Sequence, residues 1–265
     1  MSLQIGSGIT IESGISVVPQ PTVYVSQGLQ LYLDAGLTSS YPGAGPTWFD
    51  LSGNGNNLTF ASPGPPAPIY NTANGGYFDM TNSGGWGWQN YATTNMPNSA
   101  GSPFCLSAWV RPNIYWSNTS SAGDENRIFS IGGSGFGSAP GSNTGINRLS
   151  TYYSPSRPQP FLAINWDNVS TFYGYPTQPA AGWSSWVHLA SNYDGTTRSL
   201  WVNGVMVKSD LPASSVYPAT KRSITLCNSN STFRDYISVA MVYNRGLTST
   251  EILQNFTAFR SRYGV

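Results

Sequence analysis

Apolar and polar residues alternate along many short segments of this chain. In Leu29–Ala35, LQLYLDA, leucine stands at every second position, as is typical of a strand with one buried face. Trp186–Tyr193 alternates in a similar way, and the pairs Asp194-Gly195 and Asn203-Gly204 accept the positive φ angles of tight hairpin turns. The pattern therefore predicts a meander of three antiparallel strands that ends near residue 208.

The two faces of this predicted meander differ in chemistry. Val187 and Leu189 lie on one face, whereas Trp186, His188 and Asn192 lie on the other. Further strand candidates, most of them short and separated by turn-forming residues, are Tyr77–Met80, Phe104–Arg111, Arg127–Ile131, Asn147–Tyr153, Phe161–Trp166, Ser223–Cys227 and Tyr236–Tyr243. This spacing predicts an all-β fold, a two-sheet antiparallel jelly-roll sandwich.

One segment near the C-terminus has the pattern of a helix. Thr248 and Glu251 have the spacing of a capping box, and apolar residues recur on one stripe from Ile252 to Phe259. Gly264 follows as a stop signal. We expect this helix to close one end of the sandwich.

The first 26 residues differ from the rest of the chain. IGSGIT and IESGIS repeat a cadence of isoleucine and glycine before the proline-rich residues 19–21. We therefore divide the chain into an N-terminal extended arm, residues 1–26, and a jelly-roll domain, residues 27–265. The arm is either a flexible leader or a short β element, and a β arm needs to pack against the domain or another subunit.

Composition excludes several classes of partner. The chain of 265 residues has 12 basic and 11 acidic side chains, and its first basic residue is Arg111, so it lacks the basic stripe that nucleic acids require. No apolar run approaches the roughly 20 residues of a membrane helix, and the N-terminus has no signal-peptide pattern.

We expect Cys105 and Cys227 to be buried free thiols, with a single disulfide as the alternative.

Five motifs in order resemble a known family. LQLYLDAG with WFDLSGNGNNLTF, then GGYFDM, FCLSAWVRP, WVHLASNYDGTTRSLWVNGVMV and ISVAMVYNRGLTSTEILQNF, resemble the concanavalin A-like lectin/glucanase superfamily, specifically its laminin-G-like jelly-roll modules. The resemblance runs from Gly28 to the C-terminus. The arm resembles the leaders of bacteriophage virion proteins.

The chain lacks the residues that catalysis on such a fold requires. Glycosidases of this fold carry paired carboxylates on one strand, but neither Glu12, Glu125 nor Glu251 has a second acid two or four residues away on a strand. We expect Asp124-Glu125 to lie in a solvated loop. His188 is the only histidine and matches a structural histidine of the family, so we expect a packed sheet residue and no enzyme.

Two aspartates are candidates for a metal site. Many members of the family bind calcium, and Asp79 after GGYF and Asp235 before the last strand match such positions. The sequence favours a different role for Asp79, the capping of turn backbone, because DMTNSGG lacks further acids. Calcium at Asp79 and Asp235 is the alternative; otherwise no cofactor is expected.

Aromatic residues gather in two segments that read as loops. Trp86, Trp88 and Tyr91 lie in NSGGWGWQNYATTN, and Tyr115 and Trp116 lie in RPNIYWSN. Three roles remain open for them. The first role is that of anchors at a protein interface. The second is that of a platform on which a glycan stacks. In the third, the loops fold back and bury their own aromatic side chains.

These features favour a binding protein. The first hypothesis is a non-enzymatic virion structural protein, a capsid decoration or tail component that contacts other virion proteins or further copies of itself. The alternative is a carbohydrate-binding lectin or adhesin that recognises a cell-surface glycan and acts outside the cell.

Overall fold

The computed structural model describes residues 3–5, 9–11, 23–60, 67–81, 87–90, 102–111, 124–131, 147–154, 157–166, 169–174, 185–211, 224–227 and 235–265. In chain order its elements are β1 (Leu3–Ile5), β2 (Ile9–Ile11), β3 (Leu29–Asp34), β4 (Thr47–Trp48), β5 (Leu58–Phe60), β6 (Ile69–Asn71), the 3₁₀ turn η1 (Ala73–Gly75), β7 (Tyr77–Asp79), β8 (Trp88–Asn90), β9 (Phe104–Arg111), β10 (Asp124–Ile131), β11 (Asn147–Ser154), β12 (Arg157–Trp166), β13 (Val169–Gly174), β14 (Val187–Tyr193), β15 (Arg198–Val202), β16 (Val205–Asp210), β17 (Ile224–Leu226), β18 (Tyr236–Tyr243) and α1 (Ser249–Tyr263).

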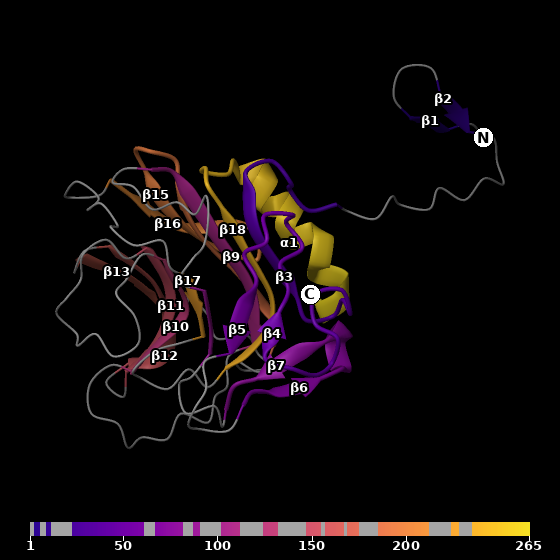
Figure 1. Cartoon of the computed structure of the whole chain (residues 1–265). Coiled ribbons are helices and arrows are strands. Elements are labelled where there is room, and N and C mark those ends of the chain that lie inside the picture. Colours follow the sequence, from indigo (N-terminus) through magenta and orange to yellow (C-terminus); the bar gives the residue numbers. More distant parts are fainter. Residues whose placement is uncertain are drawn as a thin grey trace.

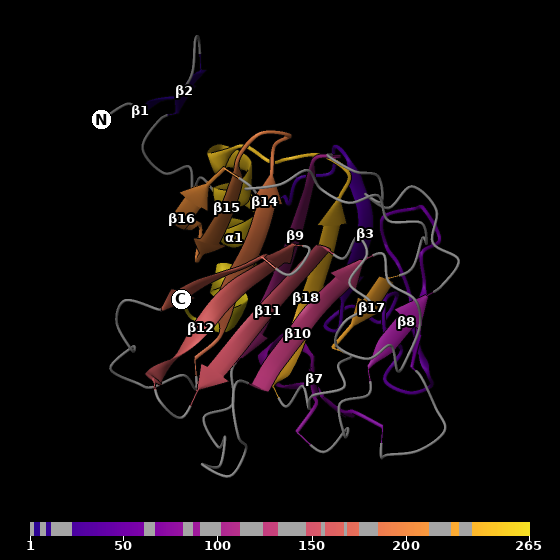
Figure 2. The same cartoon turned by 90° about the vertical axis from the view of Figure 1, so that its left-hand side faces the viewer.

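Two antiparallel sheets face each other, and α1 lies on the outer side of one of them (Figures 1 and 2). The helix-covered sheet has the order β16-β15-β14-β9-β18-β7-β6, with β3 also paired to β18. The facing sheet has the order β13-β12-β11-β10-β17-β8-β5-β4. The predicted two-sheet jelly-roll sandwich is therefore confirmed, and β1 and β2 form a separate hairpin.

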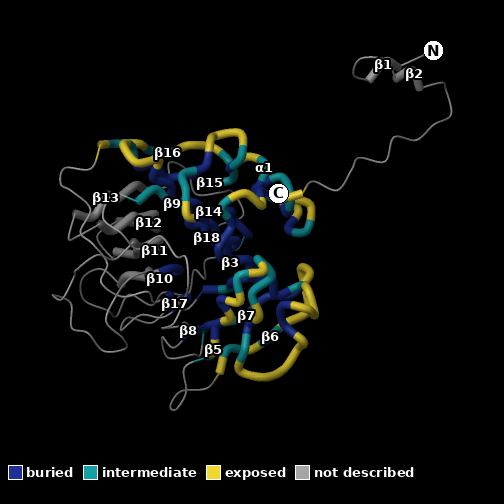
Figure 3. Tube along the Cα trace, turned by 45° about the horizontal axis from the view of Figure 1, so that its top comes forward, coloured by how far each residue is buried: buried dark blue, intermediate teal, exposed yellow. Residues whose placement is uncertain are grey.

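A core of aromatic and aliphatic side chains fills the space between the sheets. Trp48 and Trp88 of the facing sheet contact Phe78 of the helix-covered sheet, with ring centroids 4.7 and 4.4 Å from that of Phe78. All three side chains are almost fully buried, as the dark tube segments of Figure 3 illustrate for the strands around them. Such aromatic pairs add about 0.5–1.5 kcal/mol each to the stabilisation from burial.

The predicted meander is present as β14, β15 and β16. Asn203 (φ 49°) and Gly204 (φ 77°) both take the positive φ angles of a two-residue hairpin turn. Gly204 also approaches α1 closely, because a β-carbon there would lie 2.9 Å from Leu253 Cδ1. The inner face of the meander, with Val187 and Leu189, joins the core between the sheets.

Helix α1 begins and ends as the sequence predicts. The Thr248 side chain accepts a hydrogen bond from Glu251 N, Glu251 Oε2 accepts from Thr248 N, and Gly264 takes a left-handed conformation at the C-terminal cap. Its position differs from our expectation, since it covers a sheet face and does not close one end. The reason is a second apolar cluster in which Phe256 packs on Trp109, with ring centroids 5.7 Å apart.

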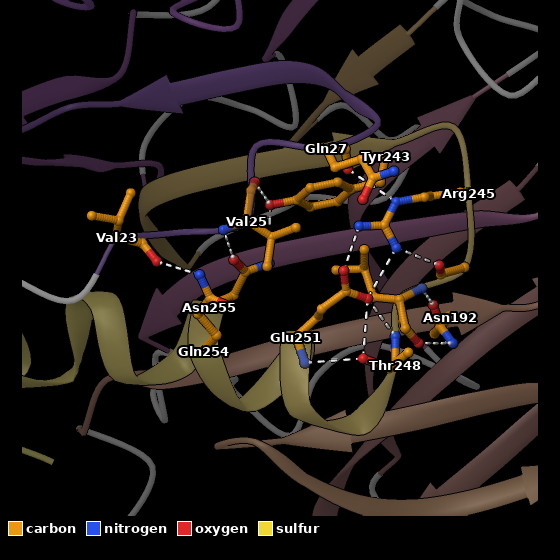
Figure 4. A network of polar contacts seen from close by, with 12 residues as sticks. Val23, Val25, Gln27, Asn192, Tyr243, Arg245, Thr248, Glu251, Gln254 and Asn255 are labelled. Carbon is orange, nitrogen blue, oxygen red and sulfur yellow. Dashed lines mark hydrogen bonds and ion pairs between the residues drawn. The ribbon is translucent and has the colours of Figure 1, made fainter. Parts of the chain in front are cut away.

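The chain joins this layer through the segment from Val23, which continues into β3 (Figure 4). Gln254 Nε2 donates to Val23 O at 2.7 Å, and Asn255 Oδ1 accepts from Val25 N at 2.9 Å. Tyr243 Oη completes the network by donating to Val25 O at 2.9 Å. Residues 23–26, assigned to the arm from sequence, thus pack on α1 and β18, while the division into arm and domain stays a prediction.

Three further expectations can be compared with the structure. Cys105 and Cys227 are buried free thiols, as predicted. The expectation of a loop at Asp124-Glu125 is wrong, because both residues pair with β11 at the start of β10. In the described part of the chain, no helix combines the length and hydropathy needed to cross a membrane.

Candidate functional site

Four residues from adjacent segments form one row across an end of the helix-covered sheet. The register pairs Tyr236 of β18 with Asp79 of β7 on one side and with Arg111 of β9 on the other. Trp186, just before β14, continues the row beside Arg111. Because alternate residues of a strand share a face, all four lie on the side that α1 partly covers. We call these four residues the Arg111 row.

The guanidinium of Arg111 lies among aromatic rings. Its Cζ is 4.0 Å from the ring centroid of Tyr236, 5.3 Å from that of Tyr77 and 5.6 Å from that of Trp186. Tyr77 and Trp186 are buried, whereas Arg111 and Tyr236 remain partly exposed. Cation–π attraction of this kind holds a guanidinium in place without neutralising its charge. The arginine is therefore held among these rings while its side chain stays partly exposed.

The end of α1 supports this arrangement from behind. Tyr263, the last helical residue, packs on Trp186 with ring centroids 4.9 Å apart. Its hydroxyl donates to Ser238 Oγ at 2.7 Å, which ties the helix end to β18. The Trp186 ring therefore packs against both Tyr263 and Tyr77, whose ring centroid is 5.5 Å away, and these contacts hold its orientation beside Arg111.

The electrostatics of the row keep its phenol protonated. Burial, and secondly the charge of Asp79, raise the pKa of Tyr236 above its ordinary value, although Arg111 acts in the opposite direction. The row thus offers guanidinium and hydroxyl donors and a carboxylate acceptor beside flat apolar faces. A polyhydroxylated ligand with C–H faces matches this combination.

The predicted metal residues lie next to each other at this end of the sheet. Asp79 Oδ1 accepts hydrogen bonds from Thr81 N at 2.9 Å and Thr81 Oγ1 at 2.6 Å, which confirms the turn-capping role. Asp235 is buried, and its carbonyl accepts from Met80 N at 3.1 Å. Within the described ranges, no three His, Cys, Asp or Glu side chains are grouped to hold a metal ion. A calcium site at these aspartates stays a prediction.

Of the five predicted aromatic site residues, the structure describes only Trp88. Trp88 lies in strand β8 and not in a loop, and it is 2% exposed, so burial is the role that the structure favours among the three left open for it. Gly87 makes this possible, since a β-carbon there would lie 2.1 Å from Leu226 O of the neighbouring strand. The other four, Trp86, Tyr91, Tyr115 and Trp116, lie outside the described residues.

The chain connects two of these four residues closely to the Arg111 row. Tyr115 follows Arg111 by four residues, so an extended chain separates their Cα atoms by at most about 14 Å. Trp116 follows directly. Sequence reasoning named Asp79 but missed Arg111, Tyr236 and Trp186, because only the pairing of strands distant in sequence brings them together.

His188 is a structural residue, as expected. It is buried under α1, and its Nε2 lies 2.8 Å from Ser107 Oγ. Burial lowers the pKa of His188 to about 3, so the imidazole is neutral at ordinary pH. Its polar contact is to a serine that is itself buried, which places the ring away from solvent.

Comparison with known proteins extends these observations. The family model of the concanavalin A-like lectin/glucanases superfamily, laminin-G type, matches residues 83–253, more than half of the chain. No curated protein sequence matches. Many solved structures are similar in fold.

Three solved structures represent this similarity. The botulinum neurotoxin serotype G binding domain is 16% identical with a TM-score of 0.58, and the match covers 86% of this chain and 50% of that one. The serotype D ligand-binding domain in complex with N-acetylneuraminic acid is 13% identical with a TM-score of 0.60 (88% and 51% covered). Domain 4 of AbnA, a GH43 extracellular arabinanase from Geobacillus stearothermophilus, in complex with arabinotriose, is 16% identical with a TM-score of 0.56 (86% and 97% covered).

These identities are low and show the fold alone. The chain spans about half the length of the toxin binding domains and nearly all of domain 4 of the arabinanase. The facing antiparallel sheets and the match over residues 83–253 agree with one another. The chain therefore belongs to the concanavalin A-like lectin/glucanase superfamily.

Proposed function

We propose that this chain is a non-enzymatic carbohydrate-binding module that holds a glycan at the Arg111 row. The observation that carries the proposal is the partly exposed guanidinium of Arg111, 4.0 Å from the Tyr236 ring centroid and in one row with Asp79. Binding sites for small ligands combine apolar faces with a few oriented polar groups, as this row does. Tyr115 and Trp116, which follow in the chain, are further candidate contacts.

Similar structures support a glycan as the ligand class. Two of them are described as complexes, one with N-acetylneuraminic acid and one with arabinotriose. Both ligands are polyhydroxylated sugars, which match the donors and acceptor of the row. The absence of catalysis is part of the same proposal, because His188 is engaged with Ser107 under the helix. A screen of glycoside hydrolase substrates that found turnover would contradict it.

A glycan array with the full chain tests the binding. A retained glycan is then titrated against Arg111→Ala, and we expect its affinity to fall at least about ten-fold, since hydrogen bonds to charged groups contribute roughly 1.5–3 kcal/mol. The matched control is Arg260→Ala, which removes an arginine from another aromatic ring, that of Phe256, on exposed α1 surface. Equal affinity for wild type and Arg111→Ala, or an array with no retained glycan, would refute the proposal.

Trp86→Ala tests the neighbouring loop in the same titration. A loss of affinity would show that Trp86 also contributes to glycan binding. An unchanged affinity would show that Trp86 does not contribute, and would leave the proposal for the Arg111 row as it stands. Trp88→Ala is unsuitable as a probe, because Trp88 belongs to the core and its truncation costs stability.

A second candidate function is a structural role in a bacteriophage virion, attached to capsid or tail. The observation that favours it is the β1–β2 hairpin that precedes the lectin-like domain, since such an arm is suited to assembly contacts. Mass spectrometry of particles purified from an infected culture is the test. Particles without this chain would contradict the role and leave the glycan proposal unaffected.

A further inference from the structure

The guanidinium of Arg111 differs from those of three other arginines in what surrounds it. Each of those three binds a carboxylate through two of its nitrogens: Arg198 with Asp210, Arg245 with Glu251 and Arg262 with Asp34. Within the described ranges, no carboxylate forms an ion pair with Arg111, whose Cζ lies instead among the rings of the Arg111 row and Tyr77. The row therefore contains a positive charge without a directly paired negative one.

Asp79, the carboxylate of the row, is engaged elsewhere. In the register Tyr236 stands between Asp79 and Arg111, so two strand spacings, about 10 Å, separate the Cα atoms of the two charged residues. Asp79 Oδ1 accepts hydrogen bonds from the backbone and the side chain of Thr81. A charge at this distance weakens the positive potential at Arg111 but does not replace a direct partner. It also repels further negative charge, so the row favours a singly charged anion.

The hydrogen-bonding groups of the row suit one such anion, a carboxylate. Cation–π attraction uses the charge of a guanidinium, whereas its five N–H donors, in a fixed fork, match the two oxygens of a carboxylate. Arg111 is partly exposed, so a ligand can reach it from solvent. The phenol of Tyr236 stays protonated, because burial and the charge of Asp79 raise its pKa. Tyr236 therefore adds a hydroxyl to the site and no negative charge.

We propose that the glycan held at the Arg111 row carries a carboxylate, and that the guanidinium of Arg111 binds this group through two hydrogen bonds. The inference rests on the proposed function and narrows its ligand class from sugars in general to acidic sugars. The neutral hydroxyls of the same sugar contact Tyr236. A neutral glycan binds more weakly, because hydrogen bonds between two charged groups are about twice as strong as those between neutral groups.

Matched pairs of sugars test the charge of the ligand. Oligosaccharides that end in a hexuronic acid or in N-acetylneuraminic acid are each compared with the same oligosaccharide in which the carboxyl group is converted to a primary amide. All are titrated against the full chain by calorimetry. We expect at least one acid to bind ten-fold or more tightly than its amide, roughly the effect of one charge-assisted hydrogen bond. The preference should shrink as added salt shortens the Debye length from about 10 Å at 0.1 M to about 3 Å at 1 M.

Arg111→Gln identifies the residue that recognises the charge. This variant keeps a side chain with hydrogen-bond donors but loses the cation, so we expect it to bind an acid and its amide with equal affinity. Arg260→Gln is the matched control, because it removes the same charge from an exposed position on α1, and it should keep the wild-type preference. Thermal unfolding of both variants checks that they are folded, and the wild-type comparison of acid with amide does not depend on either.

The outcomes separate this inference from the proposed function. Equal affinity of the wild type for acids and their amides, or retention of neutral glycans alone, would overturn the inference and leave the proposed function standing. A preference for the acid that persists in Arg111→Gln would overturn the role of Arg111 as its partner. A wild type that binds no sugar at all would overturn both.

Discussion

Acid should destabilise this protein through its single histidine well before most carboxylates titrate. His188 is buried beneath α1, with Nε2 2.8 Å from Ser107 Oγ and the ring centroid 5.5 Å from that of Trp109. Burial lowers the pKa of His188 from 6.5 to about 3. Unfolding exposes the imidazole to water, where it binds a proton below pH 6.5, so the unfolded state gains protons that the folded state does not take up.

The sign and size of this effect follow from the two pKa values. The folded pKa is the lower one, so stability is complete above pH 6.5 and falls as the pH decreases from 6.5 toward about 3. Each pH unit in this window costs about 1.4 kcal/mol. At pH 4.5 the loss relative to pH 7.5 is therefore about 2–3 kcal/mol from His188 alone.

Denaturant unfolding between pH 7.5 and 4.5 measures this loss. His188→Gln is the matched variant, because it keeps a polar side chain opposite Ser107 and does not titrate. We expect the wild type to lose about 2–3 kcal/mol more than this variant over that range. Parallel pH dependence of the two proteins would refute the reasoning, as would an NMR titration in which the only imidazole protonates near pH 6.5 while the protein stays folded.

Two further predictions concern how α1 is held. Arg262→Met should destabilise the protein by about 3 kcal/mol in denaturant unfolding, because the fully buried carboxylate of Asp34 loses a bidentate ion pair with N···O distances of 2.6 and 2.9 Å. Adding Asp34→Asn to this variant should recover part of the lost stability. Additive effects of the two substitutions would contradict an energetic coupling between Arg262 and Asp34. Thr248→Ala should cost about 1 kcal/mol through loss of the N-cap, as thermal unfolding can measure, whereas Thr257→Ala on the same helix should cost little.

The longer strands were predictable because their own side chains specify them. β9 and β18 agree with the sequence prediction at both ends, since each is an uninterrupted run of strand-forming residues. β4, β5, β6 and β8 were missed, as was the six-residue β13. The first four have two or three residues each, and their extended conformation depends on their pairing partners.

The position of α1 shows what a periodic pattern leaves out. Its apolar stripe and its caps were correctly predicted, but the stripe does not say which surface it will cover. The sequence contained a relevant signal on the meander, where Trp186 and His188 occupy the face opposite Val187. A tryptophan of that size on a nominally polar face indicates a cover, and Tyr263 of α1 provides it.

This cover also limits where the protein can bind a partner. One face of the helix-covered sheet is closed by the core between the sheets, and much of the other is closed by α1, so Trp109 and His188 are out of reach of any ligand. In the part of the chain that the structure describes, the accessible residues of this sheet lie at its boundary. The Arg111 row stands at one end, beyond the last turn of α1, and β16 forms one lateral edge. Any ligand of the described part of this sheet is therefore expected to bind where the cover by α1 ends, beside the last helical residue, Tyr263, and the partly exposed Arg111.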